Sequence, residues 1–196
     1  MSVLREAFNM PTPMKITGRS STLTNAFTSS ITPQVEPSDE EIGRALQILQ
    51  LNAADLRCAY CGDPCTEWDH LRPLVVDRKP TGYISEIHNL VPACGKCNES
   101  KGNKHWRKWM MSRARRSPNT RQIPNLVEKT RRLEAYEKWG NVHPVPFEVM
   151  VDANLWSKHW DNHQKLLSMM KKSQETADEL RAAIQMRYEE ALADDF

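Results

Sequence analysis

Residues 58–104 read CAYCGDPCTEWDHLRPLVVDRKPTGYISEIHNLVPACGKCNESKGNK, and this stretch decides how the chain folds. It carries a Cys-x-x-Cys pair at its start, Cys58 with Cys61, and a second pair near its end, Cys94 with Cys97. Two such pairs can supply four thiolates to one tetrahedral zinc ion, and four thiolates leave that ion no open position. The spacing therefore predicts a structural Zn²⁺ site that joins the two ends of the stretch.

Between and just after the cysteine pairs lie polar side chains suited to phosphodiester chemistry. Asp69 and His70 come early in the segment, Asn89 comes late, and Asn98 directly follows the last cysteine. Carboxylate and amide oxygens are ligands for hard divalent cations, and an imidazole that titrates near neutral pH can act as a general base. These residues predict a site with one catalytic metal ion.

The local pattern between the cysteine pairs favours two strands followed by a helix. TEWDHLRPLVV is rich in β-favouring residues, residues 77–82 carry turn chemistry, and YISEIHNLVP reads as extended again. Helical pattern returns only after Cys97, which places Asn98 near a helix start. Because successive strand residues point to opposite faces, we expect Asn89 to face the site and His88 to face solvent or substrate.

The elements W-D-H, N-L-V-P and C-x-x-C-N-x-x-K-G-N resemble the HNH (ββα-metal) endonucleases. The similarity is greatest to members with a four-cysteine zinc site, such as HNH type II restriction endonucleases. It implies that His70 is the general base, that Asp69 and Asn98 bind the catalytic metal, and that Asn89 braces the loop that orients the base. Many relatives have His where this chain has Asn98. An amide oxygen is a harder donor than imidazole, so we expect Mg²⁺ or Mn²⁺.

Basic residues cluster immediately after the last cysteine. The net charge of the chain is only +2, yet no Asp or Glu occurs from Ser100 to Val127. The cations of this block therefore have no acidic residue inside it with which to form i,i+4 ion pairs. Such a block favours a polyanionic partner. We expect Trp106 and Trp109, in the same block, to lie in the core. The expected nucleic-acid-binding residues are Lys101, Lys104, His105, Arg107, Lys108, Arg113, Arg115 and Arg116.

The flanking segments predict an α+β, mainly helical protein with three regions. Residues 1–37 are rich in Ser, Thr and Pro and predict an extended arm, which either crosses the surface or wraps a partner. Residues 38–140 form the nuclease core, which begins with a capping box at Ser38 and Glu41. A second cap signature at Asn125 and Glu128 precedes a helix that ends near Gly140. Residues 141–196 predict one or two long helices.

Composition and cysteine usage indicate the compartment. Five cysteines are an odd set, and four lie in metal-type pairs, which favours a reducing environment. Cys65 is left over as a free thiol, the alternative being that it replaces one of the four zinc ligands. The N-terminus has no apolar signal core, and no run is long enough to span a bilayer. We expect a cytoplasmic protein that does not enter a membrane.

These observations favour a metal-dependent endonuclease acting on double-stranded DNA, of the type II restriction class. The alternatives are a phage or mobile-element HNH nuclease and a non-catalytic zinc-stapled module that binds nucleic acid within a larger complex. One HNH site cuts one strand, so cleavage of a duplex favours a homodimer. A heptad-like stripe in the C-terminal segment could form its interface, through Leu166, Met170, Ala177, Leu180, Ile184 and Ala191.

Overall fold

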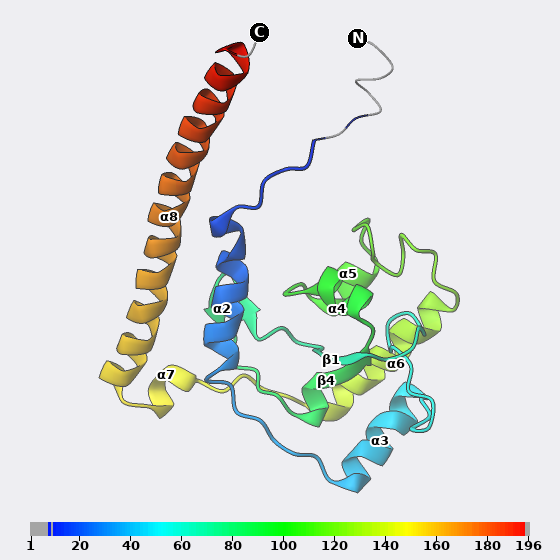
Figure 1. Cartoon of the computed structure of the whole chain (residues 1–196). Coiled ribbons are helices and arrows are strands. Elements are labelled where there is room, and N and C mark those ends of the chain that lie inside the picture. The colour runs from blue at the N-terminus through cyan, green and yellow to red at the C-terminus, as the bar shows by residue number, and fades with distance from the viewer. Residues whose placement is uncertain (1–7, 9, 195–196) are drawn as a thin grey trace. The chain divides into compact units, whose positions relative to one another are not determined.

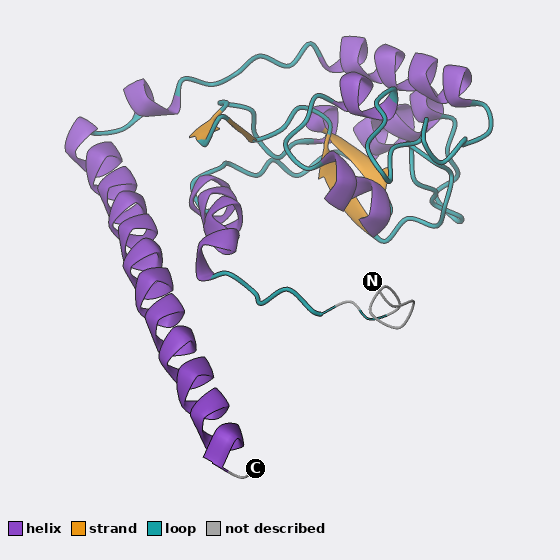
Figure 2. Cartoon of the chain, turned by 90° about the horizontal axis from the view of Figure 1, so that it is seen from above, coloured by secondary structure: helices purple, strands orange, loops and turns teal. Residues whose placement is uncertain are grey.

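The computed structural model of the chain describes residues 8 and 10–194 (Figure 1). These residues form a mainly helical α+β protein, as the sequence predicts, in which the strands are short (Figure 2). The chain divides into two compact units, one of Thr24–Asp152 and one of residues up to Leu23 together with Ala153 onward. The elements are η1 (Ile16–Arg19), α2 (Ser20–Ser29), α3 (Asp39–Leu49), β1 (Glu67–His70), β2 (Val75–Val76), β3 (Lys79–Pro80), η2 (Ile87–Asn89), β4 (Leu90–Ala93), α4 (Gly95–Lys101), α5 (Trp106–Met110), α6 (Leu126–Gly140), α7 (Phe147–Met150) and α8 (Ala153–Asp194).

The centre of the larger unit is an antiparallel pair of strands, β1 and β4, followed by helix α4. Asp69 pairs with Val91 and His70 with Leu90. Helix α4 follows β4 after one residue, Cys94, and lies beside β1 (Figure 1). The predicted order of strand, loop, strand and helix is therefore confirmed, and it carries the Asp-His pair and Asn98 on neighbouring elements.

The loop between the two strands is more structured than the sequence predicts. A small hairpin joins β2 to β3, and its two-residue turn places Asp77 and Arg78 at positive φ. The predicted extended stretch YISEIHNLVP is wrong at residues 87–89, which form the 3₁₀ helix η2 instead of strand. Because a 3₁₀ turn replaces the strand here, the alternation of side chains along a strand does not determine which way His88 and Asn89 point.

Helices α3 and α6 pack on η2 and enclose the core. The predicted capping box is confirmed, because Ser38 Oγ accepts from Glu41 N–H and the Glu41 carboxylate accepts from Ser38 N–H. The Tyr136 hydroxyl of α6 donates to the carbonyls of Ile87 and Leu90. The largest apolar side chains of the buried core are Trp106, Trp109, Tyr60, Tyr136, Leu71, Met110 and Leu133, so both tryptophans of the basic block lie in the core as predicted.

The predicted helix start at Asn125 is confirmed, but the Asn125 side chain does not cap the helix. Asn125 precedes α6, but it adopts the left-handed conformation and its side chain makes no capping hydrogen bond. A cap side chain reaches the first-turn N–H groups from extended backbone, so the left-handed conformation removes that geometry.

Residues 16–29 are helical where the sequence predicts an extended arm. Leu23, Phe27 and Ile31 are spaced four residues apart, and Thr24 and Thr28 are buried on the same stretch. No proline interrupts the segment between Pro13 and Pro33, so this i,i+4 pattern can form a helix. The first residues of the predicted arm, 1–7 and 9, lie outside the described residues.

The C-terminal segment is one helix, α8, of 42 residues. Its first half packs on the N-terminal segment of the same unit, where Ile16 N–H donates to Gln174 Oε1 at 2.6 Å. Met170 and Ala177 of the predicted stripe are half-buried there, whereas the helix is exposed from Asp178 to Leu192. Within residues 8 and 10–194, no helix combines the length and apolar character needed to cross a membrane.

Two glycine substitutions test the packing of α6 on η2. A Cβ at Gly140 would lie 2.8 Å from His88 Cβ and 3.0 Å from His88 O, whereas a Cβ at Gly43, an exposed position of α3, meets nothing within 4 Å. We expect Gly43→Ala to raise the free energy of unfolding by about 1 kcal/mol and Gly140→Ala to lower it by about 1–3 kcal/mol. Urea unfolding followed by circular dichroism measures both; a stabilising Gly140→Ala would contradict the close contact.

Candidate active site and metal centre

The four paired cysteines come together in one buried cluster. Cys58 and Cys61 precede β1, Cys94 caps α4 and Cys97 lies in its first turn. Their four Sγ atoms lie within 4.8 Å of one another, and those of Cys61 and Cys94 are 3.6 Å apart. Zinc–sulfur bonds of about 2.3 Å place the sulfurs of a tetrahedral site about 3.8 Å apart. The cluster thus has the composition and size of a zinc site.

The electrostatics of the cluster also favour a bound cation. Hydrogen bonds from Cys61 and Cys97 lower the pKa of Cys58 to about 4, while hydrogen bonds with Cys58 and Cys61 raise the pKa of Cys97. A thiolate at Cys58 is therefore stabilised by its neighbours, but four adjacent thiolates require a metal ion between them. Cys65 lies outside the cluster, where its thiol contacts the Glu67 carbonyl at 3.2 Å.

Arg121 supports the cluster from outside. Its guanidinium donates to Cys97 Sγ at 3.5 Å and to the Asp63 carboxylate at 2.8 Å, and this hydrogen bond lowers the pKa of Asp63. A positive charge beside the thiolates offsets part of the net negative charge of a four-cysteine site. Sequence alone groups Arg121 with the basic block, whereas the structure turns it towards the cysteines.

Strand β1 places Asp69 inside the protein. The side chain is buried, and its two oxygens lie 3.1 Å from Lys101 Nζ, while the Tyr60 hydroxyl donates to Oδ2 at 2.6 Å. Burial raises the pKa of Asp69, an effect that the Lys101 ammonium and the Tyr60 hydrogen bond oppose. A buried carboxylate needs such partners because an unpaired charge is costly in a medium of low polarity.

His70 is the next residue on β1 and lies at the edge of the core. Its Nε2 is 2.8 Å from Ser85 Oγ. Burial and the nearby Lys101 charge lower the pKa of His70 to about 4. The imidazole is therefore neutral at neutral pH, which is the form that can accept a proton.

Two amide side chains complete the arrangement. Asn98 donates through Nδ2 to Glu67 Oε2 at 2.6 Å, which leaves its amide oxygen on the opposite side of the group. Asn89 is fully buried and ties the loop after β1 to η2. It accepts from Arg72 N–H and donates to the carbonyls of Arg72 and Ile84.

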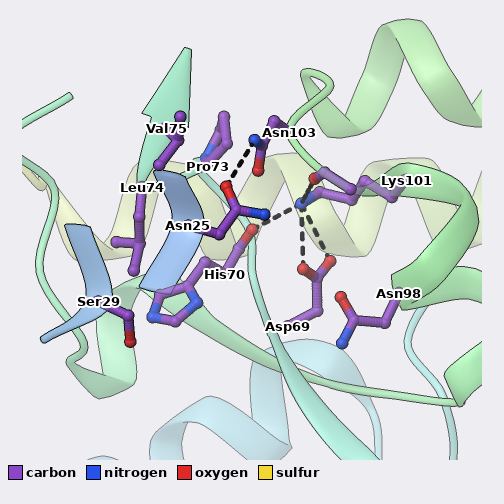
Figure 3. A pocket seen from close by; sticks show the side chains of 11 residues that line it. Asn25, Ser29, Asp69, His70, Pro73, Leu74, Val75, Asn98, Lys101 and Asn103 are labelled. Carbon is purple, nitrogen blue, oxygen red and sulfur yellow. Dashed lines mark hydrogen bonds and ion pairs between the residues drawn. The ribbon is translucent and has the colours of Figure 1, made fainter. Parts of the chain in front are cut away.

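Asp69, His70 and Asn98 line a single pocket (Figure 3). The carboxylate and the amide are oxygen ligands of the kind that a divalent cation such as Mg²⁺ prefers, so the donor set fits the metal that the sequence predicts. The Lys101 ammonium shares the Asp69 carboxylate and is the competing positive charge. The other residues of the pocket wall are Asn25, Ser29, Pro73, Leu74, Val75, Gly102 and Asn103.

Several residues of the site belong to no motif in the sequence. Tyr60 lies inside the first cysteine pair and reads there as a core aromatic. Asn25 and Ser29 belong to helix α2, and Asn25 Oδ1 accepts from Asn103 Nδ2 at 3.0 Å. The four-residue spacing of Asn25 and Ser29 is the sequence signal that places both on one face of a helix. The composition of residues 1–37 instead predicts an extended arm, which hides this spacing.

The basic block is less uniform than the sequence predicts. Lys101 is completely buried in the site, and two arginines find acidic partners outside the block: Arg107 pairs with Glu134 and Arg116 with Glu99. His105 caps α5 by accepting from Arg107 N–H. Four predicted residues are exposed and form no ion pair with another described residue, namely Lys104, Lys108, Arg113 and Arg115.

The predicted position of His88 is wrong. Its side chain is half-buried and packs against the Trp139 ring with centroids 4.3 Å apart, and its Nδ1 lies 3.8 Å from Glu86. Because η2 replaces the expected strand, His88 turns towards α6.

A strand pair and helix clamped by four cysteines, with an Asp-His pair on the first strand, define a ββα-metal unit. The family model described as HNH endonuclease matches residues 58–104. The chain therefore contains an HNH endonuclease domain, which is the family that the motifs resemble. The chain is also similar to the CRISPR-associated endonuclease Cas9 of Corynebacterium diphtheriae, with 30% identity over 117 residues. This similarity covers 58% of the chain and 10% of that protein, so the chain spans about a tenth of its relative's length. No solved structure matches the chain.

Removing one cluster cysteine tests the metal centre. We expect the wild-type protein to hold about one zinc per chain, and Cys94→Ser to lose the metal and unfold the larger unit, because metal binding at such sites is coupled to folding. Cys65→Ser is the matched control and should keep both zinc and fold. Elemental analysis and circular dichroism give the result; a stable, zinc-free Cys94→Ser protein would disprove the structural role of the metal.

Proposed function

We propose that the protein is a metal-dependent DNA endonuclease that hydrolyses phosphodiester bonds by an HNH one-metal mechanism. The observation that carries the proposal is the common pocket of Asp69, His70 and Asn98 beside the four-cysteine cluster. A non-catalytic nucleic-acid-binding module needs the cluster and the basic surface, but it has no use for these three residues in one cavity.

In this proposal His70 takes the proton from the attacking water. Its neutral state at neutral pH suits that role. Ser85 Oγ, at 2.8 Å from Nε2, fixes the ring. When Nε2–H donates to Ser85, Nδ1 keeps its lone pair, and we assign the base to Nδ1. Asn89 braces the Arg72 backbone, two residues beyond the base, and so holds the loop after β1 in place.

Asp69 and Asn98 would hold a catalytic Mg²⁺ or Mn²⁺, while the cysteines hold Zn²⁺. When bound, the divalent cation supplies stabilisation of the negative charge that develops on the phosphate and the leaving 3′ oxygen. Glu67 fixes the Asn98 amide by accepting from Nδ2, so that the amide oxygen is the atom presented to the cation.

The basic surface would bind the phosphates of double-stranded DNA. Lys104, Lys108, Arg113 and Arg115 are exposed without ion-pair partners among the described residues. Phosphate contacts of this kind give affinity that is independent of sequence and decreases steeply with salt.

We further propose a type II restriction role, with the nuclease core at residues 38–140 and a dimerisation segment at residues 141–196. One HNH site cuts one strand, so two copies related by a two-fold axis would cut both strands of a duplex. The exposed end of α8 carries large apolar side chains that a second copy could cover, Leu180, Ile184, Tyr188 and Leu192. Such exposed apolar residues are typical of interaction surfaces.

A plasmid assay with Mg²⁺ and matched variants tests the activity. Wild type should nick or linearise plasmid, and His70→Ala should reduce the rate by about 10²–10⁴-fold with DNA affinity unchanged, because a general base acts on the transition state. Asp69→Ala and Asn98→Ala should also raise the Mg²⁺ concentration required. His88→Ala, outside the pocket, is the control. Near-normal turnover in His70→Ala would remove the base assignment, and an inactive wild type would favour the non-catalytic module.

Substitutions on exposed α8 test the dimer. We expect Leu180→Gln with Ile184→Gln to convert a wild-type dimer into a monomer that nicks plasmid but rarely linearises it, because the apolar contact is lost. Glu179→Gln with Arg181→Gln changes neighbouring exposed residues and should leave the dimer intact. Sedimentation velocity at micromolar concentration reports the state. A wild-type monomer that still linearises plasmid would exclude the dimer.

A further inference from the structure

Lys101 is a charged side chain held completely inside the active-site wall. Its relative accessibility is 0%, and Nζ lies 3.1 Å from both Asp69 oxygens, 2.7 Å from the His70 carbonyl and 3.4 Å from the Gly102 carbonyl. Among the described residues, Asp69 is its one carboxylate partner. Figure 3 shows the ammonium above the carboxylate, within the same pocket wall as Asn98. A surface lysine that reaches out to DNA would look quite different.

This ammonium contacts both oxygens of the carboxylate that would bind a divalent cation. Both ions are attracted by the same carboxylate, and positive charges a few ångströms apart in a poorly solvated site repel strongly. A cation that coordinates Asp69 must therefore displace Lys101 or accept its repulsion. Asp69 also accepts a hydrogen bond at Oδ2 from the Tyr60 hydroxyl, at 2.6 Å. Because this hydroxyl carries no charge, Lys101 is the partner of Asp69 that a cation would displace.

Displacement leaves Lys101 with carbonyl contacts alone. A buried ammonium without a counter-ion is costly, so the displaced side chain needs a new anion. Lys101 follows Asn98 by three residues, which places both on one side of α4. A phosphate bound in the pocket is the anion within reach of this side of the helix.

We propose that Lys101 is a counter-ion that exchanges partners: it holds Asp69 in the resting protein and passes to a DNA phosphate when the divalent cation takes Asp69. The proposal rests on the proposed function, which supplies the cation and the phosphate. The exchange makes cation binding and DNA binding strengthen each other. The cation frees Lys101 for the phosphate, and the phosphate supplies the anion that the displaced ammonium needs. Lys101 is thereby a positioning residue that sets the cation requirement.

Isothermal titration of the zinc-loaded protein with Mn²⁺, without DNA, tests the competition directly. Lys101→Met removes the charge and keeps an apolar chain of similar length, so Mn²⁺ should bind at least about tenfold tighter than to wild type, since one unfavourable charge is gone. Lys96→Met, on the exposed side of the same helix, is the matched control and should bind as wild type does. Equal or weaker Mn²⁺ binding by folded Lys101→Met would overturn the proposal.

Coupling to DNA gives the second readout. In a His70→Ala background, which slows cleavage, adding a duplex oligonucleotide should raise Mn²⁺ affinity by at least about tenfold, and the Lys101→Met change should remove most of that gain. An equal gain in Mn²⁺ affinity with and without the Lys101→Met change would overturn the exchange of partners.

A measurement on the wild-type protein covers the case in which Lys101→Met does not fold. Lys101 is the buried lysine among the described residues, so its ammonium should give a slowly exchanging ¹⁵N resonance. Saturating Mg²⁺ should shift or broaden this resonance, and no change would overturn the proposal.

The Asp69→Ala variant distinguishes failure of the Lys101 exchange from failure of the proposed function. Loss of Mn²⁺ binding in Asp69→Ala, with no gain in Lys101→Met, overturns the Lys101 exchange alone. Mn²⁺ binding that is the same in Asp69→Ala and wild type overturns the cation site and, with it, the proposed function.

Discussion

The convergence of four cysteine sulfurs is the contact on which the rest of the site depends. Strands β1 and β4 have four residues each, and a two-stranded pair of this length is marginal by itself in water. Cys58 and Cys61 lie just before β1, and Cys94 lies between β4 and α4. A metal ion shared by these residues would hold both strands and the helix at one point, beside the pocket that Asp69 and Asn98 line.

The second constraint is the cost of burying charge. Asp69 would serve the proposed catalytic cation, and its position on β1 shields it from water. The Tyr60 hydroxyl and the Lys101 ammonium satisfy it. The site is therefore stable without relying on solvent, and its resting charge balance is set by a lysine from the neighbouring helix.

The same rule divides the basic block into two groups. Arg121 neutralises the cysteine cluster and Asp63, and Arg107 and Arg116 pair with acids outside the block. These arginines contribute to the fold as much as to any partner. The exposed cations without such pairing, Lys104 among them, are the ones suited to phosphate contacts.

The features that can be predicted from this sequence alone are those that depend on local chemistry. The two cysteine pairs, the capping box at Ser38 and the order of strand, loop, strand and helix depend on short spacings, and short spacings survive in any fold. The identity of Asp69, His70 and Asn98 as pocket residues followed from their places beside those cysteines. Tertiary structure alone decided the position of Lys101, the contact of Tyr60 with Asp69, the acidic partners of the arginines and the approach of α2 to the pocket. Each of these joins side chains from different elements of the fold, and only long-range packing determines which charges meet there and which remain exposed to water.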